Sequence, residues 1–364
     1  MGTTTFSFRT HFQCPFKCHA FCGIPERLRT LSPIDSKTGL RKKPQEEELR
    51  TQFNTFLNEQ SSKSGKKENL EAIQKQRRIV LAPNGSVVPE VPKVGREIVH
   101  GYCMTHGYRF ESPFAAPLVD LEYAEQLYEA EYGRKGRYGS LSDIERKRIA
   151  REVVDEIETA LNDEFPNKNV LLNLGLENSN EDDLKILGKY HAISPVNRPV
   201  EIEIFVRAAH ELKNKGISVG ANILLGGPGI GDPIHKALET AKFAFEIMKV
   251  DKVYLSVWIP HSKTSGIKEY KDGVVDVMSA TEAFEIKRII AERYPDKEVE
   301  LSTNRAQFWH GMHNNFKGLK IKGDGKKEIA RANVRKIAET VFGYPSMTGF
   351  EPRAVALGVP RSIP

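Results

Sequence analysis

Three cysteines near the start of the chain are the residues whose type and spacing most clearly indicate chemistry. Cys14, Cys18 and Cys22 fall within nine residues of a 364-residue sequence, and the only other cysteine is Cys103. In a reducing compartment, thiols at this spacing are typical of metal ligation or redox chemistry rather than of a disulfide. Three thiolates on one loop can hold a [4Fe–4S] cluster and leave its fourth iron without a protein ligand. We therefore predict an iron–sulfur centre.

Two other interpretations of these cysteines stay open. Zinc could be bound in a tetrahedral set completed by His11, His19 or Cys103. Alternatively, thiols at this spacing could line the buried face of one helix. Pro15 and the segment 23–25 (Gly-Ile-Pro) argue against a continuous helix there. The iron–sulfur interpretation is favoured over zinc, and zinc over structural thiols.

Two small turns are suited to holding a polar ligand. Asn84, Gly85 and Ser86 follow a short apolar run, and glycine there lets backbone carbonyls approach a ligand closely. Gly226 and Gly227 open a glycine-rich turn that lacks the lysine and hydroxyl residue of a phosphate loop. Either turn could instead be an ordinary connection, since glycine and asparagine are common in turns.

Two carboxylates are expected at strand ends. Glu177 follows an apolar run and is either a ligand-binding group or an acid that satisfies backbone donors at a helix start. Glu111 is expected at the end of the third strand, where it contacts a ligand or is a solvated loop acid. Cys103 is interpreted as a buried helix thiol, because cysteine packs as a small hydrophobe; quenching of a radical is the alternative.

The elements that must position these residues are parallel strands that alternate with helices. Apolar or alternating runs that end in turn residues predict seven strands, at 3–10, 78–81, 108–111, 170–176, 217–225, 252–258 and 298–302. Amphipathic periodicity predicts helices at 46–58, 142–165, 199–215, 237–248, 280–294 and 326–342. Near-continuous apolar strands between such helices favour an α/β fold with a parallel sheet, as a full or partial β/α barrel.

This architecture places the candidate residues at one end of a barrel. Loops after the carboxyl ends of the strands hold the chemistry of β/α barrels, and the cysteines and both small turns fall in such loops. The predicted core spans 1–305, with a polar insertion at 32–75 and a helical insertion at 121–168. A basic extension is predicted at 306–364.

The motifs resemble those of the radical S-adenosylmethionine (SAM) superfamily. In that superfamily a cysteine triad follows the first strand; its spacing is C-x3-C-x2-C, whereas this chain has C-x3-C-x3-C with Phe21 before the last cysteine. The segment 174–178 is similar to a "GLE[ST]" strand end. It occurs in the branch of the elongator catalytic subunit and the radical SAM partner of archaeosine synthase. The segments 201–229 and 250–260 also resemble that branch.

The resemblance implies a partial (β/α)6 TIM-like barrel with a helical C-terminal extension. It implies a [4Fe–4S] cluster on the three cysteines and SAM bound at Asn84, Gly85, Ser86, Glu177, Gly226 and Gly227. The implied activity is reductive cleavage of SAM to give a 5′-deoxyadenosyl radical that modifies a substrate. A flavodoxin or ferredoxin type of electron donor and a tRNA substrate are the implied partners.

Charge is compatible with such a partner but does not require one. The net charge is +6, and the segment 317–336 holds eight basic and two acidic residues, which suit either RNA or a solvated helix face. His310 and His313 are a weaker metal alternative. The competing functions are a zinc-binding interaction module and a radical SAM enzyme for a small metabolite or peptide.

The sequence predicts a cytoplasmic protein. It has no run of 18 apolar residues that could span a membrane, and Met1–Thr10 lacks the apolar core of a signal peptide.

Overall fold

The computed structural model describes residues 5–6, 46–62, 77–81, 86–133, 141–187, 189, 201–259, 266–275, 277–301, 334 and 336–343. Seven strands form one sheet, in which every pair of neighbours is parallel and the spatial order equals the chain order. The strands are β1 (Thr5–Phe6), β2 (Arg78–Leu81), β3 (Arg109–Phe114), β4 (Val170–Glu177), β5 (Ser218–Leu225), β6 (Lys252–Val257) and β7 (Glu298–Leu301).

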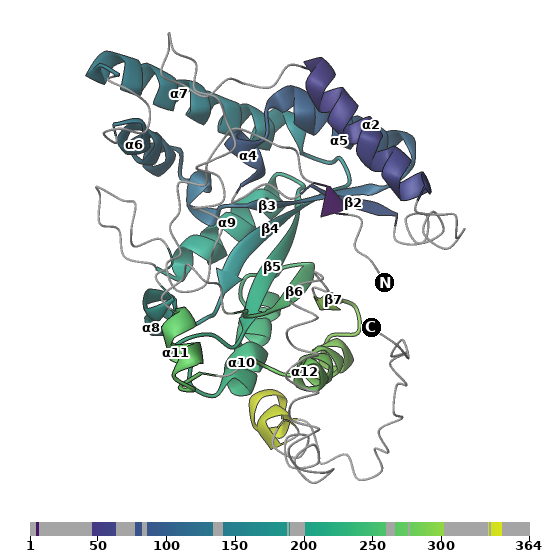
Figure 1. Cartoon of the computed structure of the whole chain (residues 1–364), viewed down its shortest axis with the longest axis vertical. Coiled ribbons are helices and arrows are strands. Elements are labelled where there is room, and N and C mark those ends of the chain that lie inside the picture. The colour runs from purple at the N-terminus through teal and green to yellow at the C-terminus, as the bar shows by residue number, and fades with distance from the viewer. Residues whose placement is uncertain are drawn as a thin grey trace.

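Helices connect the strands (Figure 1). The first half holds α2 (Glu46–Ser62), α4 (Val87–Glu90), α5 (Lys93–Thr105), η2 (Ala116–Val119), α6 (Leu121–Tyr132), α7 (Asp143–Thr159) and the π-helical turn η3 (Ala160–Glu164). The second half holds α8 (Glu181–Ile186), α9 (Glu203–Asn214), α10 (Pro233–Glu246), α11 (Gly266–Lys271) and α12 (Ala280–Arg293). Residues 336–342 are also helical.

Helix starts follow from local sequence. Ser142 and Glu145 form a capping box at the start of α7, and Ser279 and Glu282 form another at α12. Each box satisfies two backbone donors that the first helical turn leaves without partners. The serine cap predicted at 142 is therefore confirmed.

The helices cover one face of the sheet. Helix α5 packs on β2 and β3, α9 on β4 and β5, α10 on β5 and β6, and α12 on β6 and β7. Alternate strand residues such as Leu172, Val219 and Val253 point into this layer and are fully buried. Burial of this apolar layer is the main force that holds helices and sheet together.

The opposite face curls into an open barrel. In a flat sheet β3 and β7 would lie about 19 Å apart, because neighbouring strands are separated by about 4.8 Å. Nevertheless Arg109 on β3 donates to Glu298 on β7 at 2.5 and 2.7 Å, and Arg78 on β2 donates to Glu300 on β7 at 2.6 Å. Only a curled sheet allows these contacts. The predicted α/β partial barrel is confirmed.

One strand boundary was predicted wrongly. The sequence interpretation ended the third strand at Glu111 and read Ser112-Pro113 as a turn, but β3 continues to Phe114. Among the described residues, β2 pairs with β3 only as far as Glu111, so the edge of β3 at Pro113 has no strand partner on the side of β2. Proline is tolerated at such an edge because no partner needs its missing N–H.

The remaining features of the fold concern membrane-spanning helices and the predicted domain division. None of the helices in the described ranges is both long and apolar enough to cross a membrane. The division into a core at 1–305 and a basic extension at 306–364 stays a prediction, since most of 302–333 lies outside the described residues.

Candidate active site at the carboxyl ends of the strands

The residues predicted to bind a cofactor divide into those that the structure describes and those that it does not. Ser86, Glu177, Gly226 and Gly227 are described. Outside the described residues lie Cys14, Cys18, Cys22, Asn84 and Gly85, and also His310 and His313. Within the described part of the chain, no group of three or more histidine, cysteine or acidic side chains is arranged to hold a metal.

Glu177 forms the centre of the described site. It is the last residue of β4, and its backbone has a positive φ of 65°, a left-handed conformation that costs a residue with a Cβ about 1 kcal/mol or more. Its carboxylate accepts a hydrogen bond from Lys189 Nζ at 2.8 Å. Both side chains are nearly buried, at 11% and 6% exposure.

Gly175 makes room for this pair. A Cβ at this position would lie 2.8 Å from Lys189 Nζ and 3.2 Å from Glu177 Oε1. Any larger residue would therefore displace the lysine. Lys189 was not predicted from the sequence, because it follows Glu177 by twelve residues and belongs to no periodic pattern.

The glycine turn lies beside the segment that carries Lys189. Gly226 and Gly227 have φ values of 81° and 137°, which favour glycine, and they carry the chain from β5 toward α10. A Cβ on Gly227 would contact Leu187 Cδ2 at 3.4 Å. The predicted glycine turn and Leu187 thus meet at the carboxyl ends of β4 and β5.

Ser86 is engaged with its own surroundings. It is fully buried, its N–H donates to Glu90 Oε1 at 2.8 Å, and its hydroxyl oxygen accepts from the N–H of Ala115 at 3.3 Å. These bonds tie the turn after β2 to the end of β3. The hydroxyl is thereby oriented by the protein, and its contact with a cofactor stays a prediction.

The inner face of the sheet is accessible next to this rim. The inward-facing residues Gly175, Asn222, Leu224 and Ser256 are partly exposed, whereas their outward-facing neighbours are buried under helices. The inner wall therefore presents two polar side chains and one apolar side chain to whatever enters the curl from the carboxyl end.

Asn173 lies deeper on the same wall. It is 4% exposed, and in the described part of the chain its Oδ1 has no hydrogen-bond partner. Its register partner is Gly220 on β5, where an added Cβ would collide with this oxygen. A glycine is therefore required opposite the amide.

The opposite end of the barrel holds a second group of charges, which the sequence analysis missed. We call it the floor cluster; it comprises Arg78, Arg109, Glu111, Lys252, Tyr254, Glu298 and Glu300. Most of its members stand at or near the first residues of β2, β3, β6 and β7. They lie at the amino ends of the parallel strands, away from the rim that carries Glu177.

Glu111 belongs to this floor cluster, so its expected place at the top of the barrel was wrong. It is fully buried, accepts from Lys252 Nζ at 3.1 Å and from Arg109 Nε at 2.7 Å, and also accepts from the Tyr254 hydroxyl. Burial alone would raise the pKa of Glu111, but Lys252 and Arg109 outweigh burial and hold that pKa below its usual value. The group is a structural carboxylate.

The charges of the floor cluster also shift the pKa values of Glu298 and Tyr254. The hydrogen bond from Arg109 lowers the pKa of Glu298 to about 2. Burial, followed by the charge of Glu111, raises the pKa of Tyr254. Tyr254 therefore stays protonated and donates to the carboxylate.

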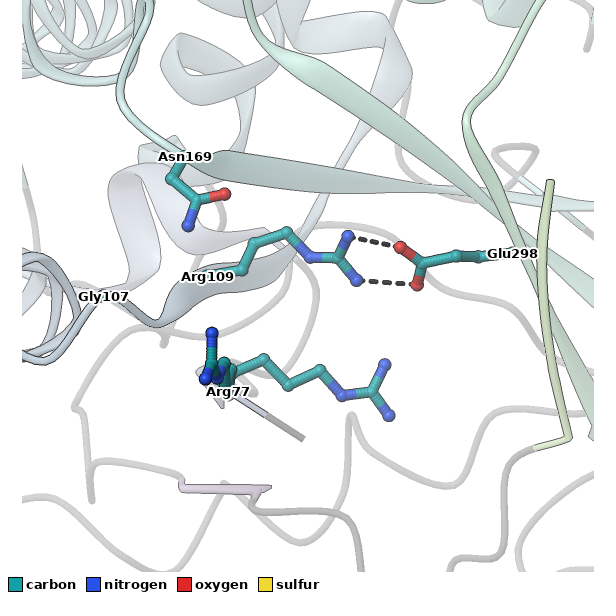
Figure 2. Close-up of a pocket in the computed structure, with 6 residues that line it drawn as sticks. Arg77, Gly107, Arg109, Asn169 and Glu298 are labelled. Atoms are coloured by element: carbon teal, nitrogen blue, oxygen red, sulfur yellow. Dashed lines mark hydrogen bonds and ion pairs between the residues drawn. The ribbon is translucent and has the colours of Figure 1, made fainter. Parts of the chain in front are cut away.

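A pocket opens on the outer side of the floor cluster. It has a volume of about 310 Å³ and is lined by Arg77, Arg78, Gly107, Arg109, Asn169 and Glu298. Figure 2 shows Arg109 and Glu298 facing each other through two bonds, with Asn169 on one side of them. This pocket lies at the amino ends of the strands.

Cys103 is a buried helix thiol, as predicted. It is fully buried on α5, and burial raises its pKa to about 12. A thiol with this pKa stays protonated at neutral pH and is a poor metal ligand or nucleophile.

Comparison with known proteins gives only distant likenesses. No family model matches the chain, and no protein of curated function matches it. Among solved structures, the archaeal Methanocaldococcus infernus Elp3 with an N-terminal deletion has a TM-score of 0.39 at 13% identity, over 82% of this chain and 56% of that one. Streptococcus suis SuiB bound to S-adenosylmethionine has a TM-score of 0.42 at 9% identity, over 82% and 50%.

A third structure is the radical S-adenosylmethionine methyltransferase TsrM from Kitasatospora setae with cobalamin and a [4Fe–4S] cluster. It has a TM-score of 0.36 at 11% identity, over 74% of this chain and 40% of that one. The chain thus spans about half the length of the structures that it matches. At these scores the likeness establishes no family, and the partial barrel stands on the strand order and the ion pairs across its open side.

Proposed function

We propose that this chain is a radical SAM enzyme. The proposed cluster ligands are Cys14, Cys18 and Cys22, and the proposed SAM contacts are Asn84, Gly85, Ser86, Glu177, Lys189, Gly226 and Gly227. When bound, the [4Fe–4S] cluster and SAM would together supply a carbon radical that abstracts hydrogen from an unactivated position. The cysteine spacing supports the cluster, and the described rim supports the SAM site.

The observation that carries the proposal is the Glu177–Lys189 pair at the carboxyl rim. A nearly buried ion pair adds little stability, because desolvation offsets much of the attraction. Glu177 also has a strained backbone, and such strain is concentrated at functional sites. A carboxylate beside an ammonium matches the amino and carboxylate groups of an amino acid, which SAM carries.

The chain's own residues would divide the work of holding that ligand. Glu177 would accept hydrogen bonds from the ligand ammonium, and Lys189 would donate to the ligand carboxylate. Gly175 leaves room for the Lys189 ammonium beside Glu177, and Gly226 and Gly227 let the backbone approach closely. The accessible inner wall would then exclude water from a substrate that enters the curl.

The decisive experiment is SAM cleavage by anaerobically purified, reconstituted protein under a strong reductant. Wild type is expected to be brown and to release 5′-deoxyadenosine. Cys18→Ala is expected to keep its far-UV circular dichroism but to lose cleavage completely, because a cluster with two thiolates is not held. Cys103→Ala is the matched control, since its thiol is buried on α5, and it should retain cleavage.

Two outcomes would contradict the proposal. Colourless wild-type protein with stoichiometric zinc would favour a zinc-binding interaction module. Deoxyadenosine release at the wild-type rate from Cys18→Ala would show that the cysteines are not the ligands.

For the substrate we propose tRNA, with a small metabolite or peptide as the alternative. The net charge of +6 and the basic segment 317–336 support a polyanionic partner. Phosphate contacts make binding depend steeply on salt, so tRNA affinity should fall by orders of magnitude between 50 and 200 mM salt, as for proteins with about six or more such contacts. If the protein does not bind tRNA at low salt, tRNA is excluded as the substrate.

An external electron donor of the flavodoxin or ferredoxin type is part of the proposal, because the chemistry needs an electron that the chain does not supply. The proposed location is the cytosol, whose reducing conditions keep cluster thiols free of disulfides.

A further inference from the structure

The pocket at the amino ends of the strands is unusually rich in hydrogen-bond donors. Among the residues that the structure describes, three arginines and the amide of Asn169 line it, and Glu298 is the one acidic residue. It lies away from the rim that carries Glu177, so the proposed radical chemistry does not use it. The donors and charges of this pocket that lack a partner within the protein indicate which kind of ligand the pocket could bind.

Two of the arginines are largely committed to the floor cluster. Arg109 uses its Nε, one Nη1 and two Nη2 hydrogens on Glu111 and Glu298, which leaves one of the five N–H groups of a guanidinium. Arg78 donates through Nη2 to Glu300, but its buried Nε has no acceptor among the described residues. A buried donor without an acceptor is costly unless a ligand or water accepts from it.

Arg77 differs from both. Its side chain makes no ion pair or hydrogen bond with any other residue that the structure describes, although its carbonyl accepts from the N–H of Arg109. Its φ of 46° is also left-handed, which an arginine adopts only when its surroundings impose it. The turn that begins β2 thus places an unpaired guanidinium at the mouth of the pocket.

The local charge does not balance. Arg77, Arg78, Arg109 and Lys252 give four positive charges, and Glu111, Glu298 and Glu300 give three negative ones, so one positive charge is left over. Glu298 repels an incoming anion weakly, because both of its oxygens are bound by Arg109. The excess positive charge therefore lies on the side of Arg77.

We propose that this pocket binds a small phosphate-bearing anion, with Arg77 and Asn169 as the main donors and Arg78 Nε and the remaining Arg109 N–H as supporting ones. Guanidinium groups match the tetrahedral oxygens of phosphate and stay charged at every physiological pH. A volume of about 310 Å³ is at the lower end for small-molecule sites, which suits a diphosphate or a compact phosphorylated metabolite.

The test is calorimetric titration of the full-length protein with inorganic pyrophosphate, with ionic strength held constant by sodium chloride. Wild type should bind with a Kd on the order of 0.1 mM. Arg77→Gln and Asn169→Ala should each weaken binding, the arginine change by about tenfold or more, because hydrogen bonds from a charged donor are the stronger ones. Neither side chain is buried, so neither variant should unfold the protein.

Arg148→Gln is the matched control, since it removes the same charge from an exposed position on α7 outside the pocket. It should bind pyrophosphate as wild type does. Equal affinity of wild type and Arg77→Gln, or no binding beyond that of chloride at the same ionic strength, would overturn the proposal.

Two further arms identify the source of the phosphate. ADP should compete with pyrophosphate if the site takes a phosphorylated small molecule. A short RNA duplex that binds more tightly than pyrophosphate and loses this affinity in Arg77→Gln would assign the pocket to nucleic acid and overturn the small-molecule assignment. All of these measurements work on protein without a cluster, so their failure is independent of SAM cleavage.

Discussion

The two ends of the barrel both contain buried opposite charges, but they use them differently. At the amino end, Glu111 is surrounded by several cations and a tyrosine hydroxyl, and every charge of the floor cluster has more than one partner. At the carboxyl end, Glu177 and Lys189 form a pair at the edge of an accessible wall, on a strained backbone. We expect the floor cluster to stabilise the fold. We expect Glu177 and Lys189 to exchange their mutual contact for contacts with a ligand.

The largest effect is expected from Glu111→Gln at the floor. The substitution leaves the buried Lys252 and the partly buried Arg109 with too little negative charge, and breaking a buried network from one side costs about 3–5 kcal/mol. The free energy of unfolding, measured with urea, should fall by about this amount. Glu152→Gln removes an exposed pair on α7 and should change it by less than about 1 kcal/mol. Equal effects would mean that the floor cluster is not structural.

The next effect is expected at the rim, and on binding rather than on folding. Glu177→Gln keeps the shape but removes the charge that would meet the ligand ammonium. SAM affinity, measured by equilibrium dialysis, should fall by about tenfold or more, as expected for a charged hydrogen bond. Asp182→Asn removes a nearby exposed charge and should leave affinity unchanged. If Glu177→Gln binds SAM as tightly as wild type does, the carboxyl end is not the ligand-binding end of the barrel.

A steric test addresses the wall between the two ends. Gly220→Ala places a methyl group against Asn173 Oδ1, and overpacking of this kind costs about 1–3 kcal/mol. Adding Asn173→Ala should recover part of the loss in thermal unfolding. Gly101→Ala on α5, where nothing lies within 4 Å of the new methyl group, should instead stabilise by up to about 1 kcal/mol.

The smallest effect is the pH dependence of the floor. A carboxyl whose folded pKa is depressed contributes stability above its unfolded pKa, and this contribution is lost as pH falls toward the folded value. For Glu298 that window runs from about 4.5 down to about 2. Because the side chain is half exposed, solvent screening limits the contribution to about 1 kcal/mol. In Glu298→Gln, the free energy of unfolding measured with urea should depend less on pH across this window. The same pH dependence as in wild type would contradict the lowered pKa of Glu298.

Much of the fold could be read from the sequence because its signals are local. Strand β2 was predicted at its observed bounds, the serine cap at Ser142 was predicted as well, and the predicted end of β4 at 176 is one residue short of the observed end at Glu177. Apolar runs, caps and glycine turns are each defined within a few residues. Such signals survive without knowledge of the tertiary structure.

The charge partners could not be read in this way. Arg109 and Glu298 are 189 residues apart, and the local sequence around either residue does not indicate its partner. One clue was available: Arg78, Arg109 and Lys252 each stand at the first position of a strand, and of these Lys252 is fully buried. Lys189 gave no such clue, since it lies outside any helix or strand.

The ion pairs to β7 also constrain how a ribosome can deliver this chain. Arg78, Arg109 and Lys252 leave the exit tunnel before Glu298 and Glu300, so until β7 is made these three cations have Glu111 as their one counter-charge within the floor cluster. Burying them at that stage would cost more than it returns. We therefore expect the amino end of the sheet to close only after β7 has been synthesised.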